Sequence, residues 1–574
     1  MSLQQRRLQE VPEETRRIAQ AAFPHGNIYM RLGEGLGIVY EDADFAALFP
    51  AVGQPGETPW RLALVVVMQF MENLSDRQAA DAVRGRIAWK YALCLELEDA
   101  GFNYSVLSEF RTRLVVGGAE ALILERMLAH LKAQGLVKAG GRGRTDSTHV
   151  LAAIHSLNRL ELVGRTLQAV LEDLARQVPE WLTSQVPVEW FDRYGPRIEE
   201  YRLPKKETER TALAEQIGRD GQYLLAGLDR LSNAELSALS SLETLRQVWQ
   251  QQYAIADQHL RWRNQAELPP AGERIASPYD VQARFSKKRE ETWVGYKVHL
   301  TETCDDALPH LITQVETTLA TGADINALDP IHQDLAHLDL VPSEHIVDMG
   351  YASGESISTS HTDYGVELVC PVHADTGWQA QTPGAFDLAQ FSIDWPAHRV
   401  TCPSGPTSRS WMSTKTSHGK PAIFVRFSPT DCTPCPARAL CTRSIAAREL
   451  TLIPQAAYLA LQKAPRQQQT PTFAQRYAVR AGLEGTLSQA VAVLGLRRTR
   501  YMGLAKTHLQ HILTAAALNL FRLANWLNGV PPAHTRRSHF AALATSVASP
   551  TASSLIAPPD SARLEPLVDI RYTN

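Results

Sequence analysis

The sequence predicts an α/β fold with a mixed β-sheet at its centre. The chain has 574 residues, more than one ordinary hydrophobic core accommodates, so several domains or large insertions are expected. Strand-like segments recur along the chain, and the later ones alternate with a helix start, which is typical of an α/β core. Helical periodicity dominates before residue 140 and again between about 151 and 270. These observations predict a sheet core, a helical N-terminal region and insertions between the strands.

Residues 1–140 form the predicted helical N-terminal domain. Thr58 can cap a helix that has Pro59 at its first position, and Ser75 and Gln78 have the spacing of a capping box. Short helices joined by tight turns are compatible with a helix-turn-helix DNA-binding unit, and equally with a small helical bundle. The pattern alone leaves both interpretations open, and it favours the bundle.

The predicted core extends over residues 141–530. Asp and Gly are depleted in strands, whereas β-branched and aromatic residues are enriched, and a half-buried strand alternates between apolar and polar side chains. The segment WVGYKVHLTET shows this alternation most clearly. The expected strands are RTDSTHV at 144–150, WVGYKVHLTET at 293–303, HLITQVETT at 310–318, SEHIVD at 343–348 and YGVELVCPV at 364–372.

Two insertions and a tail complete the predicted organisation. A helical insertion is expected over about 155–272, and a Cys-containing, β-rich insertion over about 375–465. From about Thr470 helical segments follow, and TPTFAQRYAVRAGLEGTLSQAVAVLG is interpreted as one continuous helix. Residues 531–574 are rich in Pro, Ser, Ala and Thr, which predicts a disordered tail.

Composition places the chain among soluble globular proteins, with 44% hydrophobic and 21% charged residues. The N-terminal segment MSLQQRRLQEVPEETRR is followed by no apolar stretch, which argues against a secretory signal. The longest apolar run, LALVVVMQFM from Leu62, is too short to span a bilayer and predicts a buried helix. We therefore expect a cytoplasmic protein.

The charge is unevenly distributed. Net charge is −3, so no global basic field indicates a nucleic-acid partner. Between residues 474 and 510, however, Glu484 is the single acid. A local basic surface can bind phosphates whatever the net charge, because salt confines its field to roughly 8–10 Å. The basic residues of this stretch are Arg476, Arg480, Arg497, Arg498, Arg500 and Lys506.

Three acids stand in unusual positions. Asp146 lies inside a strand-like segment, Asp348 ends an apolar strand, and Glu484 follows Tyr477 and Arg480 at helical spacings that put all three on one face. Each acid alone has a simpler interpretation. An Asp after a strand is commonly a turn or helix cap, and Arg480 with Glu484 could be a surface pair contributing about 0.2–0.5 kcal/mol.

Together the three acids favour a divalent-metal site. Carboxylates from different elements are the ligands of Mg²⁺, and two such ions can act on both the attacking and the leaving oxygen of a phosphodiester. Without metal, clustered carboxylates repel one another and raise one another's pKa.

Four of the seven cysteines fall within 40 residues of one another. These are Cys402, Cys432, Cys435 and Cys441, which contain one C-x2-C pair. In a cytosolic chain this cluster suggests metal before disulfide, and four thiolates could close a tetrahedral structural zinc site. The alternative is a set of reduced thiols in a small β-rich insertion, and both stay open.

Residues near the proposed site suggest further contacts. His149 and His299 are interpreted as structural hydrogen-bonding residues, although the pair His299 and Lys297 could face DNA or metal. A basic run could contact phosphates, though such runs are usually solvated. It consists of Arg284, Lys287, Lys288 and Arg289.

These motifs together resemble a DDE-type bacterial insertion-sequence transposase with a ribonuclease H-like catalytic core. RTDSTHV is similar to the first-strand motif, and IVDMGYAS to the motif of the second Asp. YAVRAGLEGTLSQ resembles the helix of the branch defined by Tyr, two residues, Arg, three residues, Glu, six residues and Lys. Tyr477, Arg480 and Glu484 fit this pattern, whereas Val491 stands where the branch has Lys. The similarity covers most of residues 40–527.

The resemblance implies a specific chemistry. Asp146, Asp348 and Glu484 would hold two Mg²⁺ or Mn²⁺ ions, and water would cut DNA at the ends of the element to release a 3′-hydroxyl. That hydroxyl would attack target DNA by in-line displacement, without a covalent protein intermediate. Tyr477 and Arg480 would contact phosphates near the scissile bond, with Arg suited by its planar fork. Arg497, Arg498 or Lys506 would take the place of the missing Lys, and a homodimer on paired ends is expected.

Two other functions compete with an active transposase. A transposase-derived binding protein would recognise DNA without cutting it, but a repelling acidic cluster gives a binder no benefit beside DNA. A stand-alone ribonuclease H-like nuclease would cut without joining, but the large insertions favour a protein that recognises specific ends. Strand transfer separates the last two hypotheses, because only a transposase joins a 3′-hydroxyl to a second duplex.

Overall fold

The computed structural model describes residue 3 and residues 10–530, apart from short gaps at 51, 54–55, 155–156, 232–235, 237, 257–258 and 417–418. The described residues up to 530 form one compact unit. The predicted disordered tail lies outside the described residues and stays a prediction.

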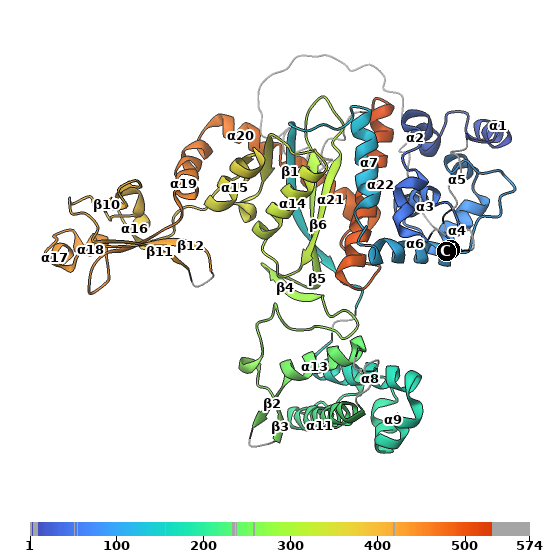
Figure 1. The fold of residues 1–574 in the computed structure, drawn as a ribbon, viewed down its shortest axis with the longest axis horizontal. Coiled ribbons are helices and arrows are strands. Elements are labelled where there is room, and N and C mark those ends of the chain that lie inside the picture. Colours follow the sequence, from blue (N-terminus) through green and yellow to red (C-terminus); the bar gives the residue numbers. More distant parts are fainter. Residues whose placement is uncertain are drawn as a thin grey trace, which may run out of the picture. The chain divides into compact units, whose positions relative to one another are not determined.

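A mixed β-sheet forms the centre of the α/β fold, as predicted (Figure 1). β1 pairs antiparallel with β5 on one side and parallel with β7 on the other, and β7 pairs parallel with β8. β4 and β6 pair antiparallel with successive halves of β5. The strands are β1 (Arg142–Leu151), β4 (Arg284–Lys288), β5 (Glu291–Thr303), β6 (Ile312–Leu319), β7 (Glu344–Val347) and β8 (Glu367–Val369).

All five strands expected from alternation occur in this sheet. β5 shows why the alternation was readable: Tyr296, Val298 and Leu300 are buried in the hydrophobic core, and the side chains between them point to the opposite face. β4 coincides with most of the basic run, which was not expected to be a strand.

Helices cross between the parallel strands and cover the sheet. α14 (Ile325–His337) connects β6 to β7, and a 3-10 turn, η4 (Met349–Tyr351), and α15 (Gly354–Tyr364) connect β7 to β8. α14 packs on β6, as does the long helix α22 (Leu504–Leu527). α22 is buried along most of its length because it also packs against N-terminal helices, beside α7 in Figure 1.

The N-terminal region is helical. Thr58 and Pro59 occupy the expected positions at a helix start, but the Thr58 side chain makes no capping bond because its hydroxyl donates to Glu57. Ser75 and Gln78 form the expected capping box, and the apolar run from Leu62 is a buried helix. Its side chains belong to the same hydrophobic cluster as the sheet and α22. The elements are α1 (Glu13–Ala22), α2 (Ile28–Leu36), η1 (Asp42–Leu48), α3 (Pro59–Met71), α4 (Asp76–Gly85), α5 (Ile87–Ala92), α6 (Ser105–Val116) and α7 (Leu122–Ala133).

The segment between β1 and β4 has a hydrophobic cluster of its own. Its long helices pack on one another, and a two-stranded hairpin follows them. The elements are α8 (Arg159–Gln177), α9 (Pro179–Gln185), α10 (Glu189–Tyr194), η2 (Glu200–Arg202), α11 (Glu207–Leu231), α13 (Ser240–Gln252), β2 (Tyr253–Ala256), β3 (His259–Trp262) and η3 (Gln265–Glu267).

The Cys-containing segment forms two small antiparallel sheets over a separate cluster of apolar side chains. A helix, α19 (Gln455–Gln468), then returns and packs on α15. The other elements are α16 (Trp378–Gln381), η5 (Leu388–Gln390), β9 (Ser392–Asp394), β10 (Arg399–Thr401), β11 (Ser410–Lys415), β12 (Pro421–Arg426), α17 (Pro429–Cys432), α18 (Arg438–Cys441) and β13 (Glu449–Leu452).

The helix predicted from Thr470 as one continuous element is two helices. α20 (Pro471–Ala478) ends before Val479, and α21 (Ala481–Leu494) begins after Arg480. At the junction the carbonyls of Tyr477, Val479 and Arg480 accept bonds from amides three residues later, which tightens the turn.

Helices that could cross a membrane are absent from the described part of the chain: none is both long and apolar enough.

Candidate active site

Pairing of β1 with β7 brings two of the predicted acids together. The register places Thr145 beside Val347, so the next residues along these parallel strands, Asp146 and Asp348, are neighbours. They lie where β7 ends. The carboxyl end of parallel strands is where open α/β sheets place their functional groups.

Asp348 combines two roles. It follows β7 directly and caps η4, accepting a hydrogen bond from the Gly350 amide at 2.8 Å. Burial raises the pKa of the Asp348 carboxyl, and the negative charge of Asp146 raises it further. The cap predicted as the simpler interpretation is therefore real, but the neighbouring acid shows that the carboxyl also faces a second negative charge.

Arg480 links the third acid to this pair. One guanidinium nitrogen donates to Asp146 Oδ2 at 2.6 Å, and another donates to Glu484 Oε1 at 3.2 Å. The Arg480 side chain is 18% exposed, whereas that of Glu484 is 65% exposed. The predicted i,i+4 pair exists, but it is more than a surface pair because the same cation neutralises a carboxylate of the sheet.

Tyr477 packs beside this cation. The Arg480 guanidinium lies 5.9 Å from the centre of the Tyr477 ring, and Tyr477 stacks on Phe473. Tyr477 also joins a small apolar cluster with Ile346 and Val369 of the neighbouring strands. Burial raises the pKa of Tyr477, so its hydroxyl stays a proton donor at neutral pH.

A fourth acid, Asp324, was missed in the sequence. It directly precedes α14, accepts a bond from the Ser147 hydroxyl at 3.3 Å, and pairs with Lys297 at 2.9 Å. A Cβ at Gly350 would lie 3.0 Å from Asp348 Oδ1 and 3.4 Å from Asp324 Oδ2, so the glycine separates the two carboxylates. The only sequence signal was an Asp at a helix start, which is too common to single out.

His299 has the structural role expected of it. It is buried under the site, and its Nδ1 lies 2.6 Å from the Tyr351 hydroxyl. Burial lowers the pKa of His299 to about 4, so it is neutral near pH 7. His149 lies against Trp293, 3.6 Å from Glu291.

The donor set around Asp146 and Asp348 suits a hard cation, because carboxylate oxygens are the ligands that Mg²⁺ and Mn²⁺ take. The space left by the missing Cβ of Gly350 lies between the carboxylates of Asp348 and Asp324. Among the described residues, however, no three His, Cys, Asp or Glu side chains are grouped so that they could hold a metal ion. Arg480 supplies the positive charge between Asp146 and Glu484 instead.

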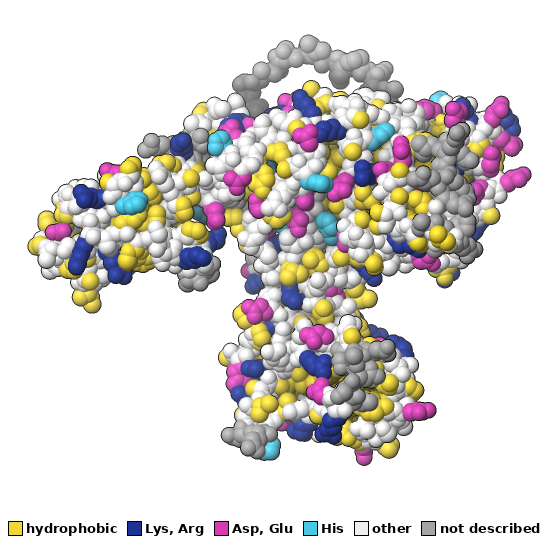
Figure 2. Space-filling view, viewed as in Figure 1, with side chains coloured by type: hydrophobic (Ala, Val, Ile, Leu, Met, Phe, Trp, Pro, Cys, Tyr) yellow, Lys and Arg dark blue, Asp and Glu magenta, His cyan; other side chains and the backbone are white. Residues whose placement is uncertain are grey.

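The predicted DNA-contacting residues occupy different environments. Arg497 and Arg498 are exposed, and Arg497 also bonds Thr148 of β1 at 2.9 Å. Lys506 is exposed in the first turn of α22. Lys297 is largely buried in its pair with Asp324, and Arg284 bonds backbone carbonyls of its own loop. On the face drawn in Figure 2, the Lys and Arg side chains are dispersed among acidic ones.

The four clustered cysteines line one small cavity of about 30 Å³. None is in a disulfide, and Cys402 Sγ accepts a bond from the Ser404 amide at 3.3 Å. Burial raises the pKa of the Cys441 thiol, and the charges of the other three thiols, Cys402, Cys432 and Cys435, act on it in the same direction. The four groups therefore lie near one another.

Two family models match the chain. Residues 401–524 match the transposase DDE domain, and residues 18–113 match the transposase domain DUF772. The first match contains the cysteine cluster and Glu484, and the second covers most of the N-terminal helices. No curated protein matches the chain.

Proposed function

We propose that this chain is a DDE transposase of an insertion-sequence family, as its two family matches support, and that Asp146, Asp348 and Glu484 form its catalytic centre. The observation that carries the proposal is the pairing of β1 with β7, which sets Asp146 beside Asp348, together with the bridge from Asp146 through Arg480 to Glu484. Three acids more than 130 residues apart in sequence are thereby connected.

The sheet supports a ribonuclease H-like core. The first strand is central, with antiparallel strands on one side and parallel strands reached through helices on the other. This arrangement puts Asp146 in the middle of the sheet and Asp348 at the end of the adjacent strand, at an edge that DNA can approach.

Asp146, Asp348 and Glu484 would hold two Mg²⁺ or Mn²⁺ ions. When bound, such ions supply Lewis-acid activation of an attacking oxygen and stabilise charge on the leaving oxygen. Arg480 keeps two of the acids together in their absence. If the acids bound cations, the guanidinium would be free to bind a DNA phosphate, for which its planar fork is suited. The Tyr477 ring, which lies beside the Arg480 guanidinium, would restrict the positions that this side chain can take.

The reaction is two successive in-line displacements at phosphorus. In the first, water attacks a phosphodiester at the end of the element, a P–O bond breaks, and a 3′-hydroxyl leaves. In the second, that hydroxyl attacks a phosphodiester of target DNA: a new P–O bond forms to the 3′-oxygen of the element, the P–O bond to the 3′-oxygen of the target strand breaks, and a target 3′-hydroxyl leaves. Positioning by fixed side chains accounts for much of the rate in such transfers.

The remaining basic residues would hold DNA around the site. Arg497, Arg498 and Lys506 are exposed and belong to the segment that follows Glu484. Lys297 and Arg284 are tied to protein groups, so their proposed DNA contacts require rearrangement. We further propose that the N-terminal helices recognise the ends of the element and that two copies act on paired ends.

The three acids are tested by alanine substitution with the DNA that flanks the chain's own reading frame. Asp146→Ala, Asp348→Ala and Glu484→Ala should each lower Mg²⁺-dependent cleavage by at least about 100-fold, because each removes a ligand or its partner. End binding, measured by gel shift, should stay within a few-fold. Asp363→Ala, an exposed acid of α15, is the matched control. Full cleavage by any one of the three variants removes that acid from the centre.

Assays with the same DNA distinguish a transposase from the two alternatives, a binding protein and a stand-alone nuclease, which the family matches do not favour. A binding protein derived from a transposase would shift the DNA without cutting it. A stand-alone nuclease would cut the DNA but would not join the 3′-hydroxyl end to a second, labelled duplex. A transposase gives both products.

We also propose a structural zinc site at Cys402, Cys432, Cys435 and Cys441. Four thiolates are the usual donor set of a closed tetrahedral zinc site, and these four line one cavity. Binding requires the thiols to turn toward a common centre. The apolar cluster of this segment is small, and a small core gains most from such a link.

Zinc is tested by metal analysis of the purified chain. About one zinc per chain is expected, and Cys435→Ser should lower the zinc content and the unfolding temperature of this segment. Cys94→Ser changes a buried cysteine of the N-terminal helices and should leave the zinc content unchanged. If the purified protein contains no zinc although the growth medium was supplemented with it, the site is excluded.

A further inference from the structure

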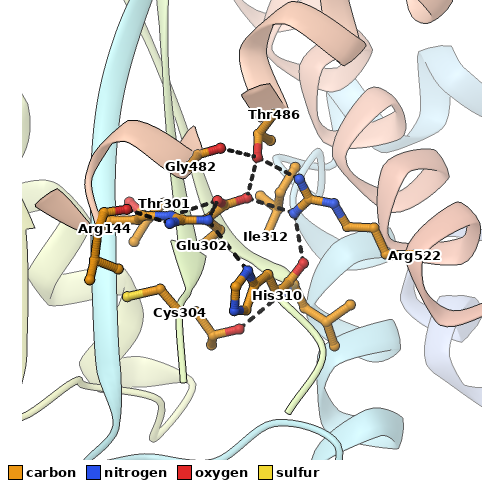
Figure 3. Close-up of polar contacts among 12 residues, drawn as sticks. Arg144, Thr301, Glu302, Cys304, His310, Ile312, Gly482, Thr486 and Arg522 are labelled. Carbon is orange, nitrogen blue, oxygen red and sulfur yellow. Dashed lines mark hydrogen bonds and ion pairs between the residues drawn. The ribbon is translucent and has the colours of Figure 1, made fainter. Parts of the chain in front are cut away.

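A fully buried carboxylate connects two strands of the sheet to two C-terminal helices (Figure 3). Glu302 of β5 lies directly opposite Arg144 of β1, and its Oε1 accepts two bonds from that guanidinium, at 2.8 and 2.6 Å. Its Oε2 accepts a bond from Arg522 of α22 at 2.6 Å and one from the Thr486 hydroxyl of α21 at 2.8 Å. Glu302 has no exposed side-chain surface.

Charge keeps this carboxylate ionised inside the protein. Burial raises the pKa of Glu302, but Arg522 and Arg144 outweigh it, so the pKa is lowered overall. A buried acid with two cations on opposite sides is a fixed junction, because removing any member leaves a charge without its partner.

The junction reaches the segment that carries Arg480 at two points. Arg144 donates to the carbonyl of Val479, the residue before Arg480, at 2.5 Å. Thr486 lies two residues after Glu484. The two contacts therefore lie on either side of Arg480 and Glu484 in the sequence, and Arg480 reaches Asp146 of β1.

Gly482 permits this close approach. A Cβ at that position would lie 2.2 Å from a guanidinium nitrogen of Arg144, which is itself held by Glu302 and Val479. Helix α21 can therefore rest against Arg144 only with glycine there. Arg144 also binds a carbonyl of the junction between α20 and α21.

We propose that Glu302, with Arg144, Arg522 and Thr486, positions the start of α21 so that Arg480 bridges Asp146 and Glu484. These are positioning residues. They act on the start of α21 through the bond from Arg144 to the Val479 carbonyl and the bond from Thr486 to Glu302. The consequence for activity rests on the proposed function, whereas the consequence for the order of α21 does not.

Thr486→Val tests the link, because it removes the hydroxyl and keeps the shape. Its matched control is Thr507→Val in α22, a buried threonine whose hydroxyl has no hydrogen-bond partner among the described residues. Thr486→Ser restores the hydroxyl. Each variant is compared with the full chain by amide hydrogen exchange over residues 477–490, and by cleavage of a duplex carrying the reading frame and its flanks.

In Thr486→Val we expect exchange over 477–490 to quicken, and the cleavage rate with saturating protein to fall about 10- to 100-fold. Affinity for the duplex should change less than about threefold. Thr507→Val should match the wild type, and Thr486→Ser should recover most of the rate.

Unchanged exchange and unchanged cleavage in Thr486→Val would overturn the positioning role. A drop in cleavage that Thr507→Val shares would also overturn it, since loss of stability would then explain both. If the wild type cuts no DNA, the proposed function fails, and the exchange measurement alone decides the positioning role.

Discussion

Asp146 and Asp348 lie on adjacent strands of the sheet, and their charges bear on the stability of the fold. Burial raises the pKa of Asp348, and repulsion by the Asp146 carboxylate on the adjacent strand raises it further. For an acid whose folded pKa is raised, stability is lost as pH rises from its unfolded pKa through its folded pKa. At neutral pH the pair therefore weakens the fold unless a cation lies between the acids.

Asp348→Asn should consequently stabilise the metal-free protein by about 1 kcal/mol at pH 7. The amide can still accept the bond from Gly350, but it carries no charge to be repelled by Asp146. Near the unperturbed Asp pKa of about 3.9 the gain should disappear. Thermal unfolding at both pH values is the measurement, and Glu355→Gln, an exposed acid, is the control.

Mg²⁺ should make the wild type more stable than Asp348→Asn. The wild type is expected to gain unfolding temperature on adding the ion, since ligand binding stabilises the folded state, and Asp348→Asn is not. A variant less stable than the wild type in the absence of metal would contradict the repulsion argument.

At the residue scale, sequence was informative where a residue type stood in the wrong place. An Asp inside a strand singled out Asp146, and the register then placed it beside Asp348. Asp324 gave no such signal, because an acid before a helix is ordinary. Lys297 was predicted to contact DNA because it lies on the same face of its strand as His299. Its ion pair with Asp324 is a tertiary contact that the sequence does not reveal. The roles of the site residues stay predictions.

At the scale of elements, periodicity predicted the strands and the capping motifs, and it failed where a tertiary contact intervened. The helix expected from Thr470 is divided at Val479 and Arg480, where Arg144, more than 300 residues away, binds the Val479 carbonyl. Both residues keep helical dihedral angles, so local propensity carried no sign of the break.

Two glycines of α21 test this account of the helix. Gly482→Ala should destabilise the protein by about 1–3 kcal/mol, because the methyl group collides with the fixed guanidinium of Arg144. Gly485→Ala should stabilise it by up to about 1 kcal/mol, since a Cβ there meets nothing within 4 Å and alanine favours the helix. Denaturant unfolding of both variants measures the difference. Equal effects at the two positions would mean that Arg144 moves aside freely.

At the scale of the whole molecule, the hydrophobic clusters show which segments have a core of their own and which share one. The segment between β1 and β4 has a cluster of its own, and so does the Cys-containing segment. The N-terminal helices instead share one cluster with the sheet and α22. The sequence shows which faces are apolar but not which element covers them. The N-terminal helices were therefore predicted to form a domain separate from the sheet.

Removal of residues 1–140 tests whether they are separable. Helix α22 is buried from Thr507 to Ala524, with the sheet against one part of its surface and α3 and α7 against another. A chain of residues 141–530 would expose that second surface to water, so we expect it to aggregate or to lose cooperative unfolding. The control chain, residues 1–530, should unfold at the temperature of the full chain. Cooperative unfolding of residues 141–530 would instead establish the N-terminal region as an independent domain, and the shared cluster would then be an interface between two stable parts.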